Sequence, residues 1–274
     1  MGKTIKLPVD LGPQGYVRFV RKVTEGCLAA TFLAQVVYEG ELRRAYIKIY
    51  DQATQPKAII NEVLGYLCAQ ALGLPSPPVF FVEVPPSDVV ASGLPMPTSA
   101  TRAVATLEAH NPAVAGEGSA KTFFEAGSID LSYIKQRLLS SPAGRTLIAF
   151  DEAIGNGDRN IGNIVFSWKH GVVAIDHGCI LTGHSWSVCS LNSSVDGKNI
   201  AFDIVNHTPI GNSDKGAVFV AAQVMLEAYY AAMSELKIAM AYPSDSEFSA
   251  AFDFVWWKVQ RLEKRMATLL QLVI

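Results

Sequence analysis

GNGDRNIGNI, residues 155–164, is followed at residues 174–178 by AIDHG, and these two short stretches decide which fold we expect. The first holds three glycines, three asparagines, one aspartate and one arginine in ten positions. That composition suits neither the interior of a helix nor a buried strand. It predicts a polar loop, and loops of this kind often carry chemistry. We therefore ask why such an apolar chain keeps this loop near a second aspartate.

The elements on either side of the loop suggest an answer. The sequence predicts a helix over 143–154, a strand over 163–168, a turn at 169–171 and a second strand over 172–176. Asp158 and Asp176 would then lie at neighbouring ends of a short hairpin, with Asn163 between them. Two carboxylates and an amide oxygen are hard ligands that suit Mg²⁺, which usually shares its shell with phosphates and water. Phosphoryl transfer needs such positioning and charge neutralisation.

GDRNIGNI (157–164) and AIDHGCIL (174–181) resemble the catalytic and metal-binding segments of atypical members of the protein-kinase-like fold. The closest patterns are those of HipA-like kinases and phosphoinositide kinases. Both have an Asp-Arg pair, an Asn five residues after that Asp, and a downstream turn containing Asp. The resemblance implies that Asp158 orients the attacking hydroxyl or accepts its proton, that Asn163 and Asp176 bind Mg²⁺, and that Arg159 counters charge on the phosphate or on Asp158.

Two residues of the N-terminal half fit the same resemblance, which requires a lysine on the third strand and a carboxylate on the next helix. AYIKIYD (45–51) supplies Lys48, and IINEVLGYL (59–67) supplies Glu62, fourteen residues further on. Glu62 falls at the margin of an apolar helix face, where a carboxylate is costly unless it is paired. We expect it to pair with Lys48. The alternative is a surface lysine and a solvated glutamate.

The expected nucleotide contacts are less distinctive. VTEGCLAATF (23–32) joins two strands where a phosphate-covering loop would lie, but it has a single glycine. Thr24, Gly26 and nearby backbone amides are the candidates for phosphate binding, and an ordinary hairpin is the alternative. Leu107 and Glu108 fall where adenine would meet the backbone between the lobes.

The pattern of the whole chain predicts an α+β, two-lobed protein-kinase-like fold. A β-rich N-lobe is expected over 1–107 and a mainly helical C-lobe over 108–274. The expected strands cover 15–23, 29–38, 42–51, one short stretch within 75–86, and 101–109, besides the hairpin described above. The expected helices cover 57–72, 132–140, 143–154, 215–237 and 246–272.

Composition narrows the class of protein. The chain has 274 residues and a formal net charge of −2, so we expect no direct binding of nucleic acid. We find no uninterrupted apolar run of the ~18 residues that span a bilayer and no signal-peptide pattern in MGKTIKLPVD. The four cysteines, at 27, 68, 179 and 189, form no CxxC pair. We expect buried, reduced thiols in a cytoplasmic protein, with no membrane partner.

The function expected from the resemblance is ATP- and Mg²⁺-dependent transfer of phosphate to a hydroxyl, as in a HipA-like Ser/Thr kinase. The alternatives are a small-molecule or lipid kinase of the same fold, and a catalytically inactive pseudokinase that only binds nucleotide. By family analogy, a small antitoxin-like protein is a possible partner. The sequence also departs from its relatives, with Asn160 where histidine is frequent and His177 where protein kinases have phenylalanine.

Overall fold

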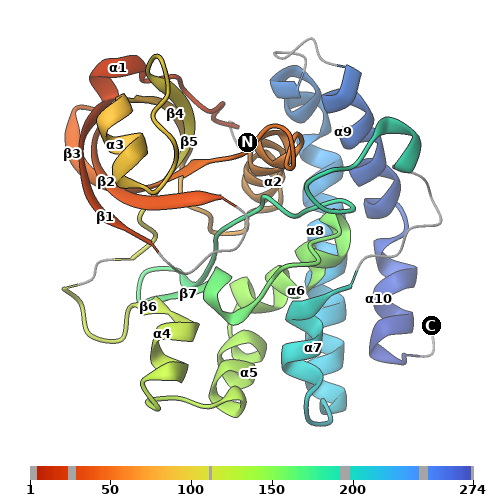
Figure 1. Ribbon diagram of the computed structural model, residues 1–274. Helices are drawn as coiled ribbons and strands as arrows, with labels where there is room; N and C mark the ends of the chain where they lie inside the picture. The colour runs from red at the N-terminus through yellow and green to blue at the C-terminus, as the bar shows by residue number, and fades with distance from the viewer. Residues whose placement is uncertain (1–4, 24–28, 111–112, 192–197, 241–245, 273–274) are drawn as a thin grey trace. The chain divides into compact units, whose positions relative to one another are not determined.

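The computed structural model describes residues 5–23, 29–110, 113–191, 198–240 and 246–272, with the side chains of 238–240 excepted. It is an α+β structure, with a five-stranded antiparallel sheet in the N-terminal part and mostly helices in the C-terminal part (Figure 1). Two compact units can be distinguished. The sheet unit comprises residues 7–59 and 77–108, and the helical unit comprises residues 1–6, 60–76 and 109–274.

The sheet unit contains all five strands that the sequence predicted for the N-terminal part. They are β1 (Tyr16–Lys22), β2 (Ala30–Tyr38), β3 (Glu41–Ile49), β4 (Val79–Val84) and β5 (Thr101–Leu107). Their order in the sheet is β1-β2-β3-β5-β4, and every pair is antiparallel. Alternation places Phe32, Ile47 and Phe80 in one fully buried cluster. The tight turn between β2 and β3 has Gly40 at φ +79°, a conformation that glycine adopts without strain.

Two short helices pack on this sheet, α1 (Gly12–Gly15) and α3 (Pro86–Ala91). The sequence did not predict α3, because the proline-rich segment that contains it suggested only turns around one strand. Pro86 occupies the first turn of α3, where its missing N–H costs nothing. Asp88 holds α3 to β1, since its carboxylate accepts hydrogen bonds from the Tyr16 hydroxyl at 2.7 Å and from the Phe19 amide at 3.2 Å. The pKa of the Tyr16 hydroxyl is raised, mainly by burial and further by the neighbouring Asp88 carboxylate.

The helical unit takes most of α2 (Ala58–Leu72). Of its apolar residues at helical spacing, Leu64, Leu67 and Ala71 are buried, and Ile59, Ile60 and Val63 are half-buried. α2 ends where the sequence predicted, with Gly73 at φ +71° and the Leu74 amide donating to the Ala69 carbonyl at 2.9 Å. The other helices of this unit are α4 (Ala120–Glu125), α5 (Leu131–Ser140), α6 (Pro142–Ile154), α7 (Ile200–Asn206), α8 (Asn212–Met240), α9 (Ser246–Val259) and α10 (Leu262–Leu270).

The helical unit also differs from the sequence prediction in three places. The segment 246–272 forms two helices, not one, with a break at Gln260 and Arg261. Neither residue is a glycine or proline, so the sequence carried no stop signal there. Residues 118–125, for which no strand or helix was expected, form β6 (Gly118–Ser119) and α4. The Ser119 hydroxyl caps α4 by accepting from the Lys121 amide at 3.2 Å. α7 was not predicted either.

α8 is the longest described helix and packs against α6 and α10 within the unit (Figure 1). Its Asn212–Lys237 portion is long and apolar enough to cross a bilayer by length and composition. A helix of a protein core passes the same criterion. Of the cysteines, Cys68 is buried, which raises the pKa of its thiol to about 12, whereas Cys179 is half-buried and Cys189 is exposed. The expectation of buried thiols therefore holds for Cys68 alone among these three.

Candidate active site

The polar loop and the second aspartate lie at one end of a hairpin in the helical unit. α6 ends at Gly155, which has φ +66°. A Cβ added at this position would lie 2.6 Å from the Leu181 carbonyl oxygen. The loop passes through η1 (Ile161–Asn163) into β7 (Ile164–Ser167), which pairs with β8 (Gly171–Ala174) in the sheet β6-β7-β8. The Ile175 amide donates to the Asn163 carbonyl at 3.3 Å. Asn163 thus stands opposite Ile175, the residue that precedes Asp176. This is the arrangement that the predicted hairpin requires.

Asp158 and Asn163 are joined by the loop's own hydrogen bonds. The Asn163 side-chain nitrogen donates to the Asp158 carbonyl oxygen at 2.9 Å, and the Asn160 amide donates to the same oxygen at 2.8 Å. Asn156 accepts from the Asp158 amide at 3.1 Å. Because the nitrogen of the Asn163 carboxamide is used as a donor, its oxygen is the atom left to accept or to coordinate. The asparagines therefore satisfy backbone groups of the loop and also fix the backbone of Asp158.

The resemblance implied that Arg159 counters charge on the phosphate or on Asp158, and in the structure its guanidinium pairs with a different carboxylate. Its side chain is completely buried and forms an ion pair with Asp151 of α6, with Nε 3.0 Å from Oδ2 and Nη2 3.1 Å from Oδ1. Nη1 donates to the Asn163 carbonyl at 3.2 Å and to the Ile175 carbonyl. The charge that Arg159 counters is thus that of Asp151, because a buried guanidinium needs a close carboxylate. Arg159 ties the loop to the segment that carries Asp176.

Asp151 is the anionic partner in this buried pair. Burial raises the pKa of its carboxyl group to about 6, although the charge and hydrogen bonds of Arg159 act in the opposite direction. The two side chains are 0% exposed. A pair so deeply buried is costly to break, because the remaining charge would have no compensation.

Asp176 has a strained backbone, with φ +62° in the left-handed region that non-glycine residues rarely adopt. Its Oδ1 accepts from the Gly178 amide at 3.4 Å. The next amide, that of His177, donates to Oε2 of Glu62 at 3.0 Å. Strain of this kind persists only where neighbouring groups hold it, and it occurs often at functional sites. Through its bond with the His177 amide, Glu62, which is 1% exposed, is one of the groups that hold the turn beginning at Asp176.

His177 is a structural residue in this arrangement. Its Nδ1 lies 3.3 Å from Nη2 of Arg159. Arginine can only donate, so Nδ1 accepts and the proton of the neutral ring resides on Nε2. The ring packs edge-to-face on Phe150, with centroids 5.7 Å apart. Gly65 of α2 permits this packing, since a Cβ there would lie 2.4 Å from the His177 Cβ.

Asn61 is the site residue that sequence reasoning missed. It is fully buried, and its side-chain nitrogen donates to the carbonyls of Gly178 at 2.8 Å and Gly183 at 2.7 Å. Its oxygen accepts from the indole nitrogen of Trp186 at 2.9 Å. A signal was present, because an asparagine preceding Glu62 within an apolar helix must find buried partners. The sequence alone could not identify those partners, which lie more than a hundred residues away.

The remaining predicted residues lie in the sheet unit or outside the described residues. Lys48 is on β3, is 8% exposed and stands between Thr31 of β2 and Val104 of β5. Its predicted pairing with Glu62 would join the two units, and it stays a prediction. Thr24 and Gly26 lie outside the described residues.

Leu107 is the last residue of β5 and Glu108 follows it, and the backbone amides of both are already engaged. The Leu107 amide donates to Pro78 at 3.1 Å and the Glu108 amide donates to Arg44 at 2.9 Å. The Glu108 carboxylate also pairs with the Arg44 guanidinium at 3.0 Å. An adenine ring would therefore need a different backbone donor in this region than these two amides.

The donor set at the hairpin end fits Mg²⁺ held together with phosphate. Within the described ranges, no three His, Cys, Asp or Glu side chains gather into a metal cage. Asn163 and Asp176 offer one amide oxygen and one carboxylate. Mg²⁺ commonly binds through one or two protein ligands, with substrate phosphates and water completing its shell. The two residues could hold the ion in that way.

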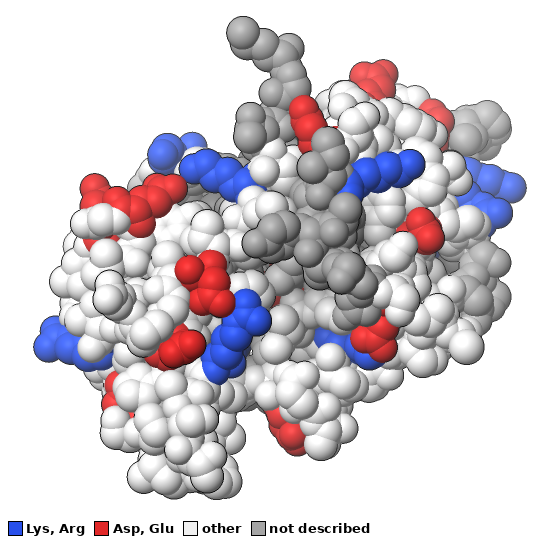
Figure 2. Space-filling view, turned by 90° about the horizontal axis from the view of Figure 1, so that it is seen from above, with Lys and Arg blue, Asp and Glu red and all other residues white. Residues whose placement is uncertain are grey.

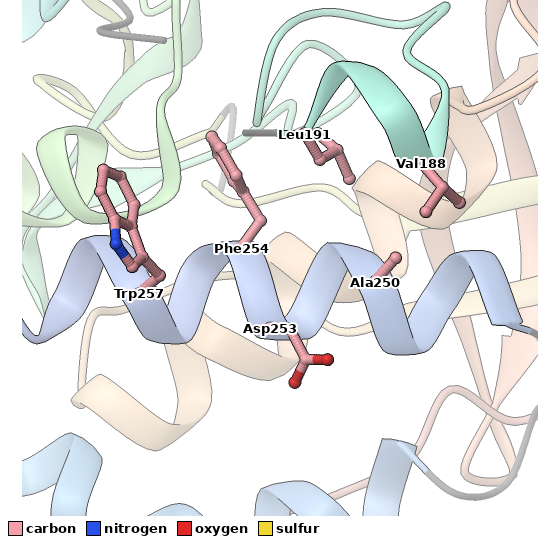
Figure 3. A pocket seen from close by; sticks show the side chains of 6 residues that line it. All are labelled: Val188, Leu191, Ala250, Asp253, Phe254 and Trp257. Atoms are coloured by element: carbon pink, nitrogen blue, oxygen red, sulfur yellow. The ribbon is translucent and has the colours of Figure 1, made fainter. Parts of the chain in front are cut away.

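A separate pocket of about 310 Å³ lies in the helical unit beside α9 (Figure 3). In this view Phe254 and Leu191 lie on the same side of α9, and Asp253 lies on the opposite side. The pocket is lined by Val188, Leu191, Ala250, Asp253, Phe254 and Trp257. None of the residues predicted for catalysis or metal binding lines it. On the face drawn in Figure 2, acidic and basic side chains are interspersed among uncharged ones.

Comparison with known proteins finds no matching family model and no matching curated protein.

Proposed function

We propose that this protein is an ATP- and Mg²⁺-dependent phosphotransferase, of the HipA-like Ser/Thr kinase type, that moves the γ-phosphoryl group of ATP to a protein hydroxyl. The observation that carries the proposal is the bond from the Asn163 side chain to the Asp158 carbonyl, at the hairpin end where Asp176 follows. It couples the backbone of the proposed base to a proposed metal ligand. A turn that served only to reverse the chain would need neither a second aspartate nor its strained backbone.

The proposed chemistry assigns each residue one task. Asp158 accepts the proton of the attacking hydroxyl, whose oxygen forms a bond to the γ-phosphorus while the bond from that phosphorus to the β–γ bridging oxygen breaks and ADP leaves. Asn163 and Asp176 would hold Mg²⁺, which when bound neutralises charge on the phosphates. Arg159 holds the two segments together through Asp151 and the Ile175 carbonyl.

The sheet unit is proposed to cover the nucleotide, in the two-lobed arrangement of the protein-kinase-like fold. Lys48 would contact the phosphates and pair with Glu62. Burial of Lys48 is consistent with this role, because a lysine taken out of water requires anionic neighbours. The cytoplasmic location and the small antitoxin-like protein partner remain predictions. The phosphate acceptor would be identified by incubating a lysate with the protein and labelled ATP.

The proposal is tested by two substitutions with distinct expected effects. Asp158→Ala should lower kcat for phosphate transfer by about 10²- to 10⁴-fold, because it removes the proton acceptor, and should leave the affinity for Mg²⁺-ATP close to that of the wild type. Asp176→Ala should instead raise the Mg²⁺ concentration that gives half-maximal activity. Both are measured with radiolabelled ATP and purified acceptor.

Asp203→Ala is the matched control, because Asp203 is an exposed aspartate of α7 in the same unit. It should change neither quantity. Normal turnover by Asp158→Ala would remove Asp158 from catalysis, and an unchanged Mg²⁺ requirement in Asp176→Ala would remove Asp176 from the metal site.

A further inference from the structure

We infer that Asn61 is a positioning residue for the Asp176 turn, and that its carboxamide holds the backbone of residues 176–183 in the shape that presents the Asp176 carboxylate to the metal. The inference rests on the proposed function for the identity of the ligand. The geometry of the clamp can be tested without it.

The carboxamide of Asn61 closes a loop at both of its ends. An amide nitrogen has two hydrogens, and the short bonds to Gly178 and Gly183, at 2.8 and 2.7 Å, use both. The Ile180 carbonyl lies further away, at 3.4 Å. Trp186, which is 4% exposed, donates to the amide oxygen at 2.9 Å and so fixes which way the carboxamide faces. One side chain thus bridges the whole 178–183 segment from α2.

The segment that Asn61 bridges cannot be expected to keep its shape unaided. Asp176 and Leu181 have φ of +62° and +63°, and Gly183 has φ of +114°. A left-handed conformation costs a non-glycine residue about 1–2 kcal/mol, so two such residues in six positions favour relaxation. The Leu181 amide is held by the Ile154 carbonyl at 2.8 Å, and the His177 amide by Glu62. Asn61 supplies one bond between these two points, at Gly178, and one just beyond them, at Gly183.

Loss of the carboxamide would leave the Gly178 and Gly183 carbonyls without this donor. Gly178 is buried and its amide contacts the Asp176 carboxylate, so a shift of Gly178 reaches the proposed metal ligand directly. Asn61 itself need not touch the metal or the phosphates. The expected defect is therefore in metal affinity, as is typical when a group that orients a ligand is removed.

The test replaces Asn61 with leucine, which has a similar shape and no hydrogen-bonding groups. Asn61→Leu should raise the Mg²⁺ concentration for half-maximal phosphate transfer by about 10- to 100-fold. Trp186→Phe, which removes only the indole donor, should raise it less and serves if Asn61→Leu does not fold. Asn199→Leu is the matched control, since Asn199 is also a buried asparagine with a donor bond to Ile148 and an acceptor bond from Phe202, both 2.9 Å.

Hydrogen exchange of the His177 and Leu181 amides gives a second measurement that needs no activity. Exchange should accelerate by about tenfold or more in Asn61→Leu, and by less in Trp186→Phe. It should not accelerate in Asn199→Leu at equal global stability. Unchanged exchange in the folded variants would overturn the clamp, and unchanged Mg²⁺ dependence would overturn its role in positioning Asp176. A wild-type protein that transfers no phosphate would refute the proposed function instead, and exchange would still decide the clamp.

Discussion

The carboxyl group of Asp151 has a pKa of about 6 in the folded chain, against an ordinary value of 3.8, chiefly because it is buried. Between these two values the folded state binds the proton more tightly than the unfolded state does. The contribution of this carboxyl to the free energy of unfolding must then fall as pH rises through that window. The fall amounts to about 2–3 kcal/mol, since one pKa unit corresponds to about 1.4 kcal/mol.

Asp151→Asn provides the measurement, because asparagine does not titrate. Urea unfolding of both proteins between pH 4 and 7 should show the wild type losing free energy of unfolding relative to the variant as pH rises. If the wild type instead gained free energy of unfolding relative to the variant as pH rises, Arg159 would lower the pKa of Asp151 more than burial raises it. The pH dependence would then be that of an ordinary ion pair.

At the scale of elements, the approach of α2 to the turn after Asp176 depends on a glycine. Gly65→Ala would place a Cβ 2.4 Å from that of His177, on the near end of the side chain where it cannot simply rotate away. We expect the free energy of unfolding to fall by about 1–3 kcal/mol, as in other overpacked interiors. Gly216→Ala in α8 is the control, because an added Cβ there meets nothing within 4 Å. It should stabilise the protein by up to about 1 kcal/mol. Denaturant unfolding measures both, and equal effects would contradict the packing argument.

The elements also show how far the sequence can predict this structure. Alternation of apolar residues predicted β1 and β3, β-rich composition predicted β2, and two strand-like stretches around a turn predicted the β7–β8 hairpin, because these signals are local. The role of Arg159 could not be predicted, since Asp151 competes with Asp158 for its charge and only tertiary packing decides between them. Asn61 was missed for the same reason. The partners of its side-chain nitrogen are backbone carbonyls, which carry no sequence signal at all.

At the scale of the whole molecule, the proposed function requires the sheet unit and the helical unit to act on one nucleotide. Lys48 belongs to the first and Glu62 to the second, so their coupling tests that requirement. Mg²⁺-ATP at 100 times its Kd should stabilise the folded protein by about 2.7 kcal/mol, which raises the Tm of a chain of this size by about 5–10 °C.

Lys48→Met and Glu62→Gln should each reduce this rise in Tm, and the double variant should lose little more than the worse single variant, because removal of either partner already breaks the pair. Arg43→Met is the control, since Arg43 is an exposed cation of the same strand that pairs with the neighbouring Glu41. It should retain the full rise. Differential scanning fluorimetry with and without millimolar Mg²⁺-ATP measures all four variants beside the wild type. Strictly additive losses would separate Lys48 from Glu62, whereas a wild type whose Tm did not respond would exclude nucleotide binding itself.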